Sequence, residues 1–221
     1  MLRPQWLMLA LLIAGGPTGI ARGDEACPAR PTARPGAAEP LFEALRLSRL
    51  VRLRAEFTEE KHIALLARPL RSSGTIYFDR DRGVARVTAA PRAERVLLTP
   101  TTLRIEKGGK VEEIPLEKSK ALRAFALVFP ALLRGERAAL EAEFDIELRG
   151  SPQSTWSLVL VPKDPALCGM IGRVAVSGRG SEVEALQVVE ASGDTTDTRF
   201  SGTRRNDDVP AAELVRGFGA P

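Results

Sequence analysis

Side chains that perform acid–base or nucleophilic chemistry are few and scattered in this sequence. His62 is the only histidine among 221 residues, and no Gly-x-Ser-x-Gly sequence offers a serine for it to activate. The acidic pairs Glu59–Glu60, Glu112–Glu113 and Asp207–Asp208 are neighbours, which point to opposite faces when they lie on a strand. They therefore do not converge on one bond as glycosidase carboxylates do. We predict no catalytic residue and no enzyme activity, and we interpret His62 as a surface or structural residue.

Metal, cofactor and nucleic-acid sites are equally poorly supported. A single histidine excludes a site with two imidazole ligands, and two cysteines exclude a four-cysteine zinc site. Gly178-Arg179-Gly180 has glycines like those of a phosphate loop, but no helix pattern follows, which favours a hairpin turn. The formal net charge is +4, yet the basic residues are spread along the chain. We therefore predict no metal, no cofactor and no nucleic-acid partner.

The N-terminus has the layout of an export signal. Met1-Leu2-Arg3 gives a positive start, Trp6–Ile13 is an apolar run, and Ala21-Arg22-Gly23 offers small residues at a cleavage site. The apolar run is too short to span a bilayer. We expect residues 1–23 to be a signal peptide. Residues 24–40, rich in proline, alanine, arginine and glycine, are predicted to form an irregular arm.

Export to an oxidising compartment changes how the two cysteines are interpreted. Cys27 and Cys168 either form one disulfide, which would tie the N-terminal arm to the body, or remain two free thiols. There is no Cys-x-x-Cys spacing, so a thiol-redox enzyme is disfavoured. On the compartment alone we expect the disulfide.

Most of the remaining chain has the period-two alternation of half-buried strands, separated by glycine and proline turns. Gly108-Gly109 is a clear hairpin signal. The predicted strands are Leu53–Phe57, Thr75–Phe78, Val84–Ala89, Val96–Leu98, Leu103–Lys107, Val111–Ile114, Phe144–Arg149, Trp156–Val161, Ile171–Val176, Val183–Val189 and Thr195–Phe200. So many antiparallel strands favour a sandwich or a barrel, because one long sheet curls.

Helical spacing of apolar residues occurs in three places. Leu41–Val51 predicts a short amphipathic helix, and Leu122–Leu133 a longer one that Pro130 kinks or splits and Gly135 ends. A further helical turn is predicted at Glu136–Leu140. The tail from Asn206 onward has little pattern. Residues 41–221 are thus expected to form one mostly β (α+β) domain, in which helices cover the concave face of a curled sheet. The space beneath them is either a filled core or a pocket for an apolar ligand.

Several strings, taken in their order along the chain, resemble the LolA-like outer-membrane lipoprotein carriers. This family begins with an amphipathic helix, a strand carrying Phe-x-Gln/Glu-x-Lys and a Pro-Leu-x-Ser-x-Gly-x-Phe-like stretch. The matching strings are Phe57–Leu66, Arg68–Phe78, Leu132–Glu136, Phe144, Trp156–Asp164 and Gly193–Thr196. The Pro-Leu-x-Ser form and the pair Lys61-His62 resemble a divergent branch of the family.

The resemblance implies an incomplete β-barrel of about eleven antiparallel strands with a helical lid over an apolar cavity. It implies a monomeric periplasmic carrier of lipoprotein acyl chains or another lipid. Its partners would be an inner-membrane exporter and an outer-membrane acceptor. Arg80 holds the place of the family's lid-latching arginine, or else is a solvated hairpin residue; Asp81 and Arg86 replace the family's proline and tryptophan after it.

On this reading the lipid-binding residues fall into three groups. The sheet side comprises Phe57, Leu70, Ile76, Phe78, Val96, Leu98, Leu103 and Ile105; the lid comprises Leu122, Phe125, Phe129, Leu132 and Leu133; the far wall comprises Phe144, Ile146, Trp156, Leu158 and Leu160. Each of these residues could instead be plain core. The alternative function is an envelope sensor or protein-interaction module on the same fold.

Overall fold

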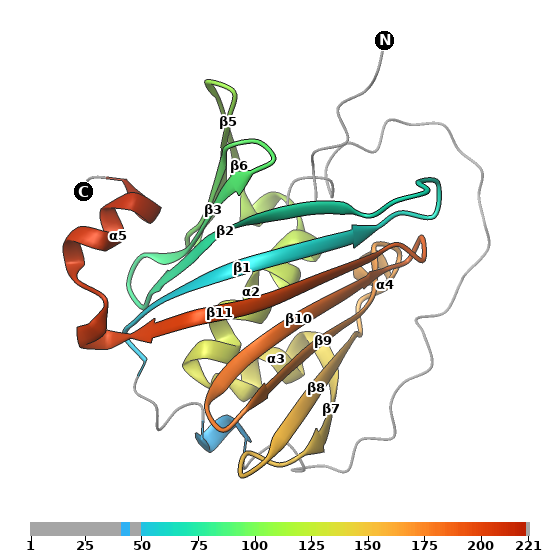
Figure 1. The fold of residues 1–221 in the computed structure, drawn as a ribbon. Helices are drawn as coiled ribbons and strands as arrows, with labels where there is room; N and C mark the ends of the chain where they lie inside the picture. The colour runs from blue at the N-terminus through green and yellow to red at the C-terminus, as the bar shows by residue number, and fades with distance from the viewer. Residues whose placement is uncertain (1–40, 45–49, 220–221) are drawn as a thin grey trace.

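A computed structural model describes residues 41–44 and 50–219, and it consists of one strongly curved antiparallel sheet with helices on both sides (Figure 1). The sheet has eleven strands in the order β6-β5-β4-β3-β2-β1-β11-β10-β9-β8-β7, and it is not closed. The predicted incomplete barrel is therefore confirmed. The strands are β1 (Arg52–His62), β2 (Leu70–Asp79), β3 (Gly83–Ala90), β4 (Glu94–Leu98), β5 (Thr102–Lys107), β6 (Lys110–Pro115), β7 (Phe144–Gly150), β8 (Thr155–Pro162), β9 (Ile171–Arg179), β10 (Glu182–Glu190) and β11 (Thr195–Arg205).

Strand β1 joins the two halves of the sheet, because it pairs with β2 on one side and with β11 on the other. Its alternation is the one that the sequence predicts: Leu53, Ala55 and Phe57 are buried, Arg54 is half-buried, and Glu56 and Thr58 are exposed. The Gly108-Gly109 hairpin between β5 and β6 is also confirmed, since both glycines have positive φ.

The connection between the two halves crosses the concave face. It consists of η1 (Leu116–Lys118), α2 (Lys120–Arg134) and α3 (Arg137–Glu143). The Ser119 hydroxyl accepts a hydrogen bond from the Leu122 N–H at the start of α2, and Gly135, with φ 69°, ends it in the left-handed conformation. Pro130 lies inside α2 but does not split it: proline removes a single N–H, and the apolar face on either side still packs.

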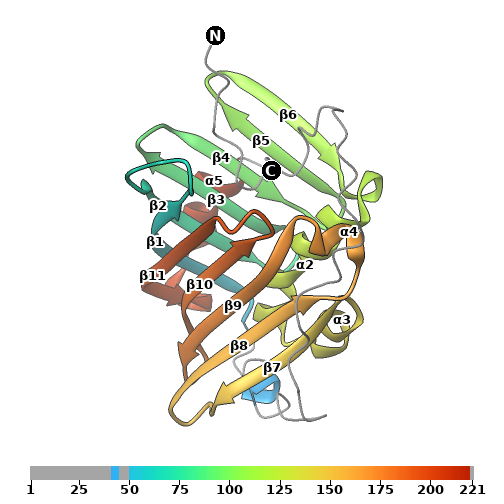
Figure 2. The same cartoon turned by 90° about the vertical axis from the view of Figure 1, so that its right-hand side faces the viewer.

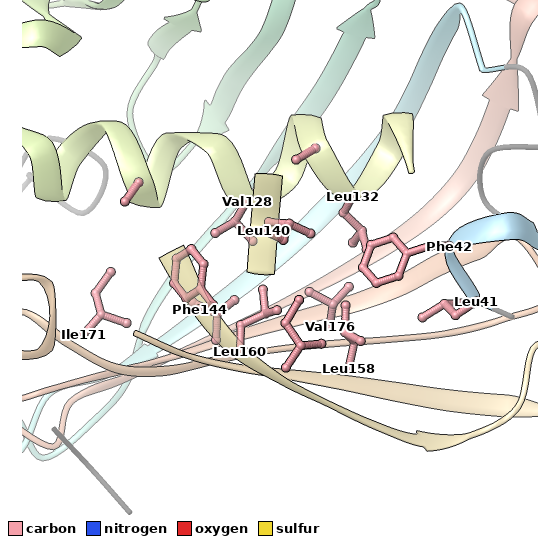
Figure 3. Close-up of a cluster of buried hydrophobic side chains, with 14 of the residues drawn as sticks. Leu41, Phe42, Val128, Leu132, Leu140, Phe144, Leu158, Leu160, Ile171 and Val176 are labelled. Atoms are coloured by element: carbon pink, nitrogen blue, oxygen red, sulfur yellow. The ribbon is translucent and has the colours of Figure 1, made fainter. Parts of the chain in front are cut away.

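Two apolar clusters fill the space between α2 and the sheet. One includes Val128 and Leu132 of α2 together with residues of β7, β8 and β9 (Figure 3). The other includes Leu122 and Leu133 of α2 together with residues of β1 to β5. Leu41 and Phe42, the first described residues of the predicted N-terminal helix, are helical and buried in the first cluster. Glu43 and Ala44 are helical as well. The remaining residues predicted for that helix are 45–49, which lie outside the described ranges, and Leu50 and Val51, which are not helical.

Two short helices depart from the sequence prediction. The segment between β8 and β9, for which no helix is predicted, contains α4 (Pro165–Cys168), which the Asp164 carboxylate caps by accepting hydrogen bonds from two backbone N–H groups. After β11 and η2 (Asn206–Asp208), the weakly patterned tail forms α5 (Ala211–Phe218). Figure 2 shows α5 on the side of the sheet opposite to α2. There its Leu214 packs against Tyr77 and Ala85.

Cys168 is disulfide-bonded and buried. Cys27, the only other cysteine in the sequence, lies outside the described residues, as do the predicted signal peptide and arm. The pairing of these two cysteines stays a prediction.

Candidate functional site

The concave face of the sheet brings apolar side chains from distant strands under α2. Phe57 of β1 lies opposite Phe200 of β11, and Ile76 of β2 lies on the same face through its pairing with Ala55. The ring of Phe129, on α2, approaches the ring of Phe200 with a centroid distance of 5.8 Å. The helix therefore rests on the middle of the sheet through aromatic contact.

An apolar cavity of about 130 Å³ remains between α2 and these strands. Its walls come from both halves of the sheet and from one face of α2. The lining residues are Phe57, Glu59, Ile76, Val84, Arg86, Val96, Leu98, Leu103, Leu122, Phe125, Ala126, Val128, Phe129, Val174, Leu186, Thr198 and Phe200. The space that the sequence left undecided is thus partly a core and partly a pocket.

One end of the cavity is polar. An Arg86 Nη2–H group donates to Glu59 Oε1 at 2.9 Å, and the Thr198 hydroxyl donates to Glu59 Oε2 at 3.0 Å. The Ser72 hydroxyl donates to Glu59 Oε1 at 3.0 Å. The Arg86 guanidinium carbon lies 4.3 Å from the centroid of the Phe57 ring, a cation–π arrangement. A charge-balanced, hydrogen-bonded cluster therefore borders an otherwise apolar wall.

A second ion pair continues this polar region along β1. Lys61 Nζ lies 3.3 Å from Glu190 Oε1, and Lys61 is 8% exposed as a whole residue. Thr196, which pairs with Lys61 in the sheet, is also buried. The inward-facing residues of β1 thus change from apolar at Phe57 to charged at Glu59 and Lys61.

The described part of α2 makes only local polar side-chain contacts. The Ser119 hydroxyl accepts from the backbone at the start of the helix, and Arg134 Nε donates to Glu136 Oε1 at 2.7 Å, just beyond its end. Contacts of α2 with the sheet are made by apolar side chains. Such contacts are non-directional, so an apolar ligand can replace them at little cost.

The structure brings together fewer than half of the residues predicted to bind lipid. Leu70 is 42% exposed at the start of β2, away from the cavity. Leu133 lines a separate hollow of about 20 Å³ beside Phe129. Those that line the main cavity are Phe57, Ile76, Val96, Leu98, Leu103, Leu122, Phe125 and Phe129. Those that lie in the packed clusters without lining it are Phe78, Ile105, Leu132, Leu133, Phe144, Ile146, Trp156, Leu158 and Leu160.

Sequence reasoning missed part of the lining. Val84 and Arg86 belong to an alternating run in β3, and Phe200 ends the predicted strand of β11, so alternation could have placed them on a common face. The local sequence pattern does not show whether this face of β3 and β11 borders the cavity or the solvent. The polar cluster joins residues far apart in the sequence, such as Glu59 and Thr198, and local patterns cannot show such pairs.

The side chain of Arg80 is held at the base of β1. Its Nε–H and Nη2–H groups donate to the Leu50 carbonyl oxygen at 3.1 and 2.8 Å. Arg80 also borders a hollow of about 280 Å³ that Arg123 and Pro130 of α2 line from the other side. No hydrogen bond joins it to α2 within the described residues, so its latch role stays a prediction.

A larger hollow lies on the other face of the sheet, and its lining mixes polar and apolar groups. It has a volume of about 1030 Å³, and most of its lining side chains, such as Thr58, Ser73 and Arg199, alternate with the cavity-lining ones. Its size alone does not make it the candidate site, because acyl chains require an apolar lining. Two surface arginines have a raised pKa, Arg104 mainly through a hydrogen bond to Glu106 and Arg149 mainly through one to Glu147. Neither lines the cavity.

Within residues 41–44 and 50–219, no group of three or more His, Cys, Asp or Glu side chains could hold a metal ion. None of the helices in these ranges is long and apolar enough to cross a membrane.

An open half-barrel with a helix over an apolar cavity defines a class of carrier and binding proteins. Residues 34–216 match the family model described as outer membrane lipoprotein carrier protein, LolA-like, and the chain belongs to this family. No curated protein matches the sequence.

Three solved structures illustrate the similarity. A LolA superfamily protein from Nitrosomonas europaea is 12% identical, with a TM-score of 0.45 over 80% of this chain and 96% of that one. A putative outer membrane lipoprotein-sorting protein domain from Vibrio parahaemolyticus is 10% identical, with a TM-score of 0.42 over 81% and 97%. MucB, in its complex with MucA from Pseudomonas aeruginosa, is 14% identical, with a TM-score of 0.41 over 80% and 58%. The family assignment rests on the match to the family model.

Proposed function

We propose that this protein is a periplasmic carrier that shields the acyl chains of lipoproteins, or of another lipid, and transfers them toward the outer membrane. The observation that carries the proposal is the apolar cavity closed by α2. The family assignment and the export signal expected at residues 1–23 support the compartment and the direction of transfer. An inner-membrane exporter and an outer-membrane acceptor are the partners that this role requires.

The energetics suit transport without covalent chemistry. Each methylene removed from water contributes about 0.8 kcal/mol, so an exposed acyl chain does not cross an aqueous compartment unaided. The contacts that hold α2 on the sheet are apolar contacts of the same kind. Loading exchanges helix–sheet contacts for helix–lipid and lipid–sheet contacts, so binding is firm and still reversible.

In this proposal loading moves α2, and the small volume of the cavity supports this. An apolar cavity of about 150 Å³ accommodates a benzene-sized molecule. The 130 Å³ under α2 therefore holds only the first few carbons of an acyl chain. Lifting α2 between Ser119 and Gly135 would uncover the cluster that contains the predicted far-wall residues. Figure 3 shows Phe144, Leu158 and Leu160 of this cluster beneath the helices. In this proposal Phe144, Ile146, Trp156, Leu158 and Leu160 bind the distal part of the chain.

Bound lipid is the direct test. The full chain is expressed with its export signal, purified from the periplasm without detergent, and examined by native mass spectrometry and by solvent extraction. A stoichiometric lipid or acylated protein supports the carrier role and names the cargo class. A variant with Phe129→Asp, purified in parallel, is the matched control for lipid that adheres nonspecifically. An apo mass, together with no uptake of a fluorescent acyl probe, would reject the carrier and favour the envelope sensor or interaction module.

A further inference from the structure

The polar cluster of Glu59, Arg86 and Thr198 borders the apolar cavity under α2. Glu59, Arg86 and Thr198 line the same cavity as Phe125 and Phe129. The Arg86 and Glu59 side chains keep about a fifth of their surface exposed, at 21% and 19%. The cluster is thus neither fully buried nor free in solvent, and a ligand that enters under α2 meets it.

Arg86 is held rigidly but is not saturated with hydrogen bonds. Its Nη2 group donates to Glu59 Oε1 and, at 3.4 Å, to the Ser72 hydroxyl, and its Nη1 group donates to the Thr88 hydroxyl at 3.2 Å. A guanidinium carries five N–H donors. The Nε–H and one Nη1–H therefore have no acceptor among the described residues. Stacking on Phe57 fixes the plane of the group.

The ion pair between Arg86 and Glu59 favours an uncharged ligand over an anionic one. Glu59 already neutralises Arg86 and also accepts hydrogen bonds from Ser72 and Thr198. A phosphate or carboxylate would have to compete with this carboxylate for the guanidinium, and would be repelled by it. A neutral oxygen acceptor needs only the unused N–H groups and leaves the ion pair intact.

We infer that this cluster binds the ester or amide carbonyl that joins an acyl chain to its glycerol or amine, with Arg86 as the donor and Glu59 as the residue that positions it. The inference rests on the proposed carrier function. It sets the direction of the chain: the carbonyl lies at the Arg86 end, and the hydrocarbon runs under Phe125 and Phe129.

A matched pair of neutral lipids tests this inference. 1,2-Dioctanoylglycerol and 1,2-dioctylglycerol have nearly the same shape, but only the first has ester carbonyls. Each is titrated as a competitor of a fluorescent naphthylamine probe bound to the delipidated protein. We expect the ester to bind about tenfold more tightly than the ether, as one hydrogen bond to a charged donor would give. We expect the ratio of the two affinities to fall to about one in Arg86→Met.

Control variants separate recognition from folding. Because Arg86→Met leaves the Glu59 carboxylate without its partner, the double variant Glu59→Gln/Arg86→Met is measured beside it, with circular dichroism as the test of folding. Arg199→Met, on the opposite face of β11, is expected to keep the tenfold preference. Equal affinity of the native protein for ester and ether, or a preference that survives both Arg86 variants, overturns the inference. If neither lipid displaces the probe, the carrier proposal itself fails.

Discussion

Replacing Phe129 with aspartate separates the proposed ligand-binding role of α2 from its packing role. Phe129 is only partly buried, it lines the cavity, and its ring contacts that of Phe200. The substitution keeps the helix and its caps and places a carboxylate on the apolar wall. We expect Phe129→Asp to abolish ligand retention while the sheet stays folded.

The surroundings of Phe129 give an expected change in the free energy of unfolding and an expected change in ligand affinity. Loss of the aromatic pair removes about 0.5–1.5 kcal/mol, and loss of the apolar burial of a half-buried ring removes about 1 kcal/mol more, so the free energy of unfolding should fall by about 2 kcal/mol. Dehydrating the new carboxylate against an acyl chain costs at least about 3 kcal/mol. That cost corresponds to a roughly hundredfold loss of affinity.

The two quantities are measured separately on the same samples. Urea unfolding followed by circular dichroism gives the free energy of unfolding, and titration with the naphthylamine probe gives the affinity. Leu214→Ala is the control, because Leu214 is buried on the opposite face of the sheet. It should lower the free energy of unfolding by about 2–5 kcal/mol without changing the affinity of the folded fraction.

Two results would refute this reasoning. An unfolded Phe129→Asp protein would show that Phe129 belongs to the core and that α2 is not a separable lid. A folded protein with native affinity would show that the ligand does not occupy the cavity under α2.

Three further substitutions test how the helices and the disulfide are held. Gly135→Ala should lower the free energy of unfolding by about 1–2 kcal/mol, because the residue has a left-handed φ of 69°; chemical denaturation measures it. Gly217→Ala should detach α5, since a Cβ there would lie 2.6 Å from Tyr77 Cδ2; limited proteolysis of the C-terminus detects it. Cys168→Ser should lower the free energy of unfolding by about 2–4 kcal/mol, because it removes a disulfide. Non-reducing peptide mapping of the native protein should recover a Cys27–Cys168 peptide.

Each of these three predictions has a control. Gly169→Ala, at the end of α4, should be nearly neutral, because Gly169 has a φ of −65°. Val215→Ala, at an exposed position of α5, should leave the proteolysis pattern unchanged. A reductant should destabilise the native protein and not Cys168→Ser. Equal effects of Gly135→Ala and Gly169→Ala would contradict the left-handed cap.

Local patterns predicted the strands well because alternation and turn chemistry are local properties. The alternation of β1 and the hairpin at Gly108-Gly109 illustrate this. The helix α5 was missed because its position depends on the outer face of β2 and β3. A signal was present: Ile76, Tyr77 and Phe78 form a continuous apolar run, which is typical of a strand covered on both faces.

The candidate site was predicted less completely than the fold. The sequence analysis assigns aromatic and branched residues to the cavity by their type. Apolar residues of the same types are buried both in the packed core and in the cavity wall, so residue type does not distinguish the two places. Leu158 and Phe57 have the same pattern in the sequence, yet Leu158 lies in a packed cluster and Phe57 lines the cavity. The difference depends on where α2 crosses the sheet, which no local pattern encodes. The partnership of Arg86 with Glu59 depends in the same way on register across three strands.

An open half-barrel keeps two strand edges that a closed barrel would lack. The edge at β7 is adjacent to α3. The edge at β6 carries Lys110, Glu112 and Glu113, all exposed, and ends in Pro115. Charges and proline on an edge strand disfavour addition of a further strand from another molecule. The opening that the proposed loading requires is therefore compatible with a dispersed protein, because the exposed backbone of β6 is a poor template for aggregation.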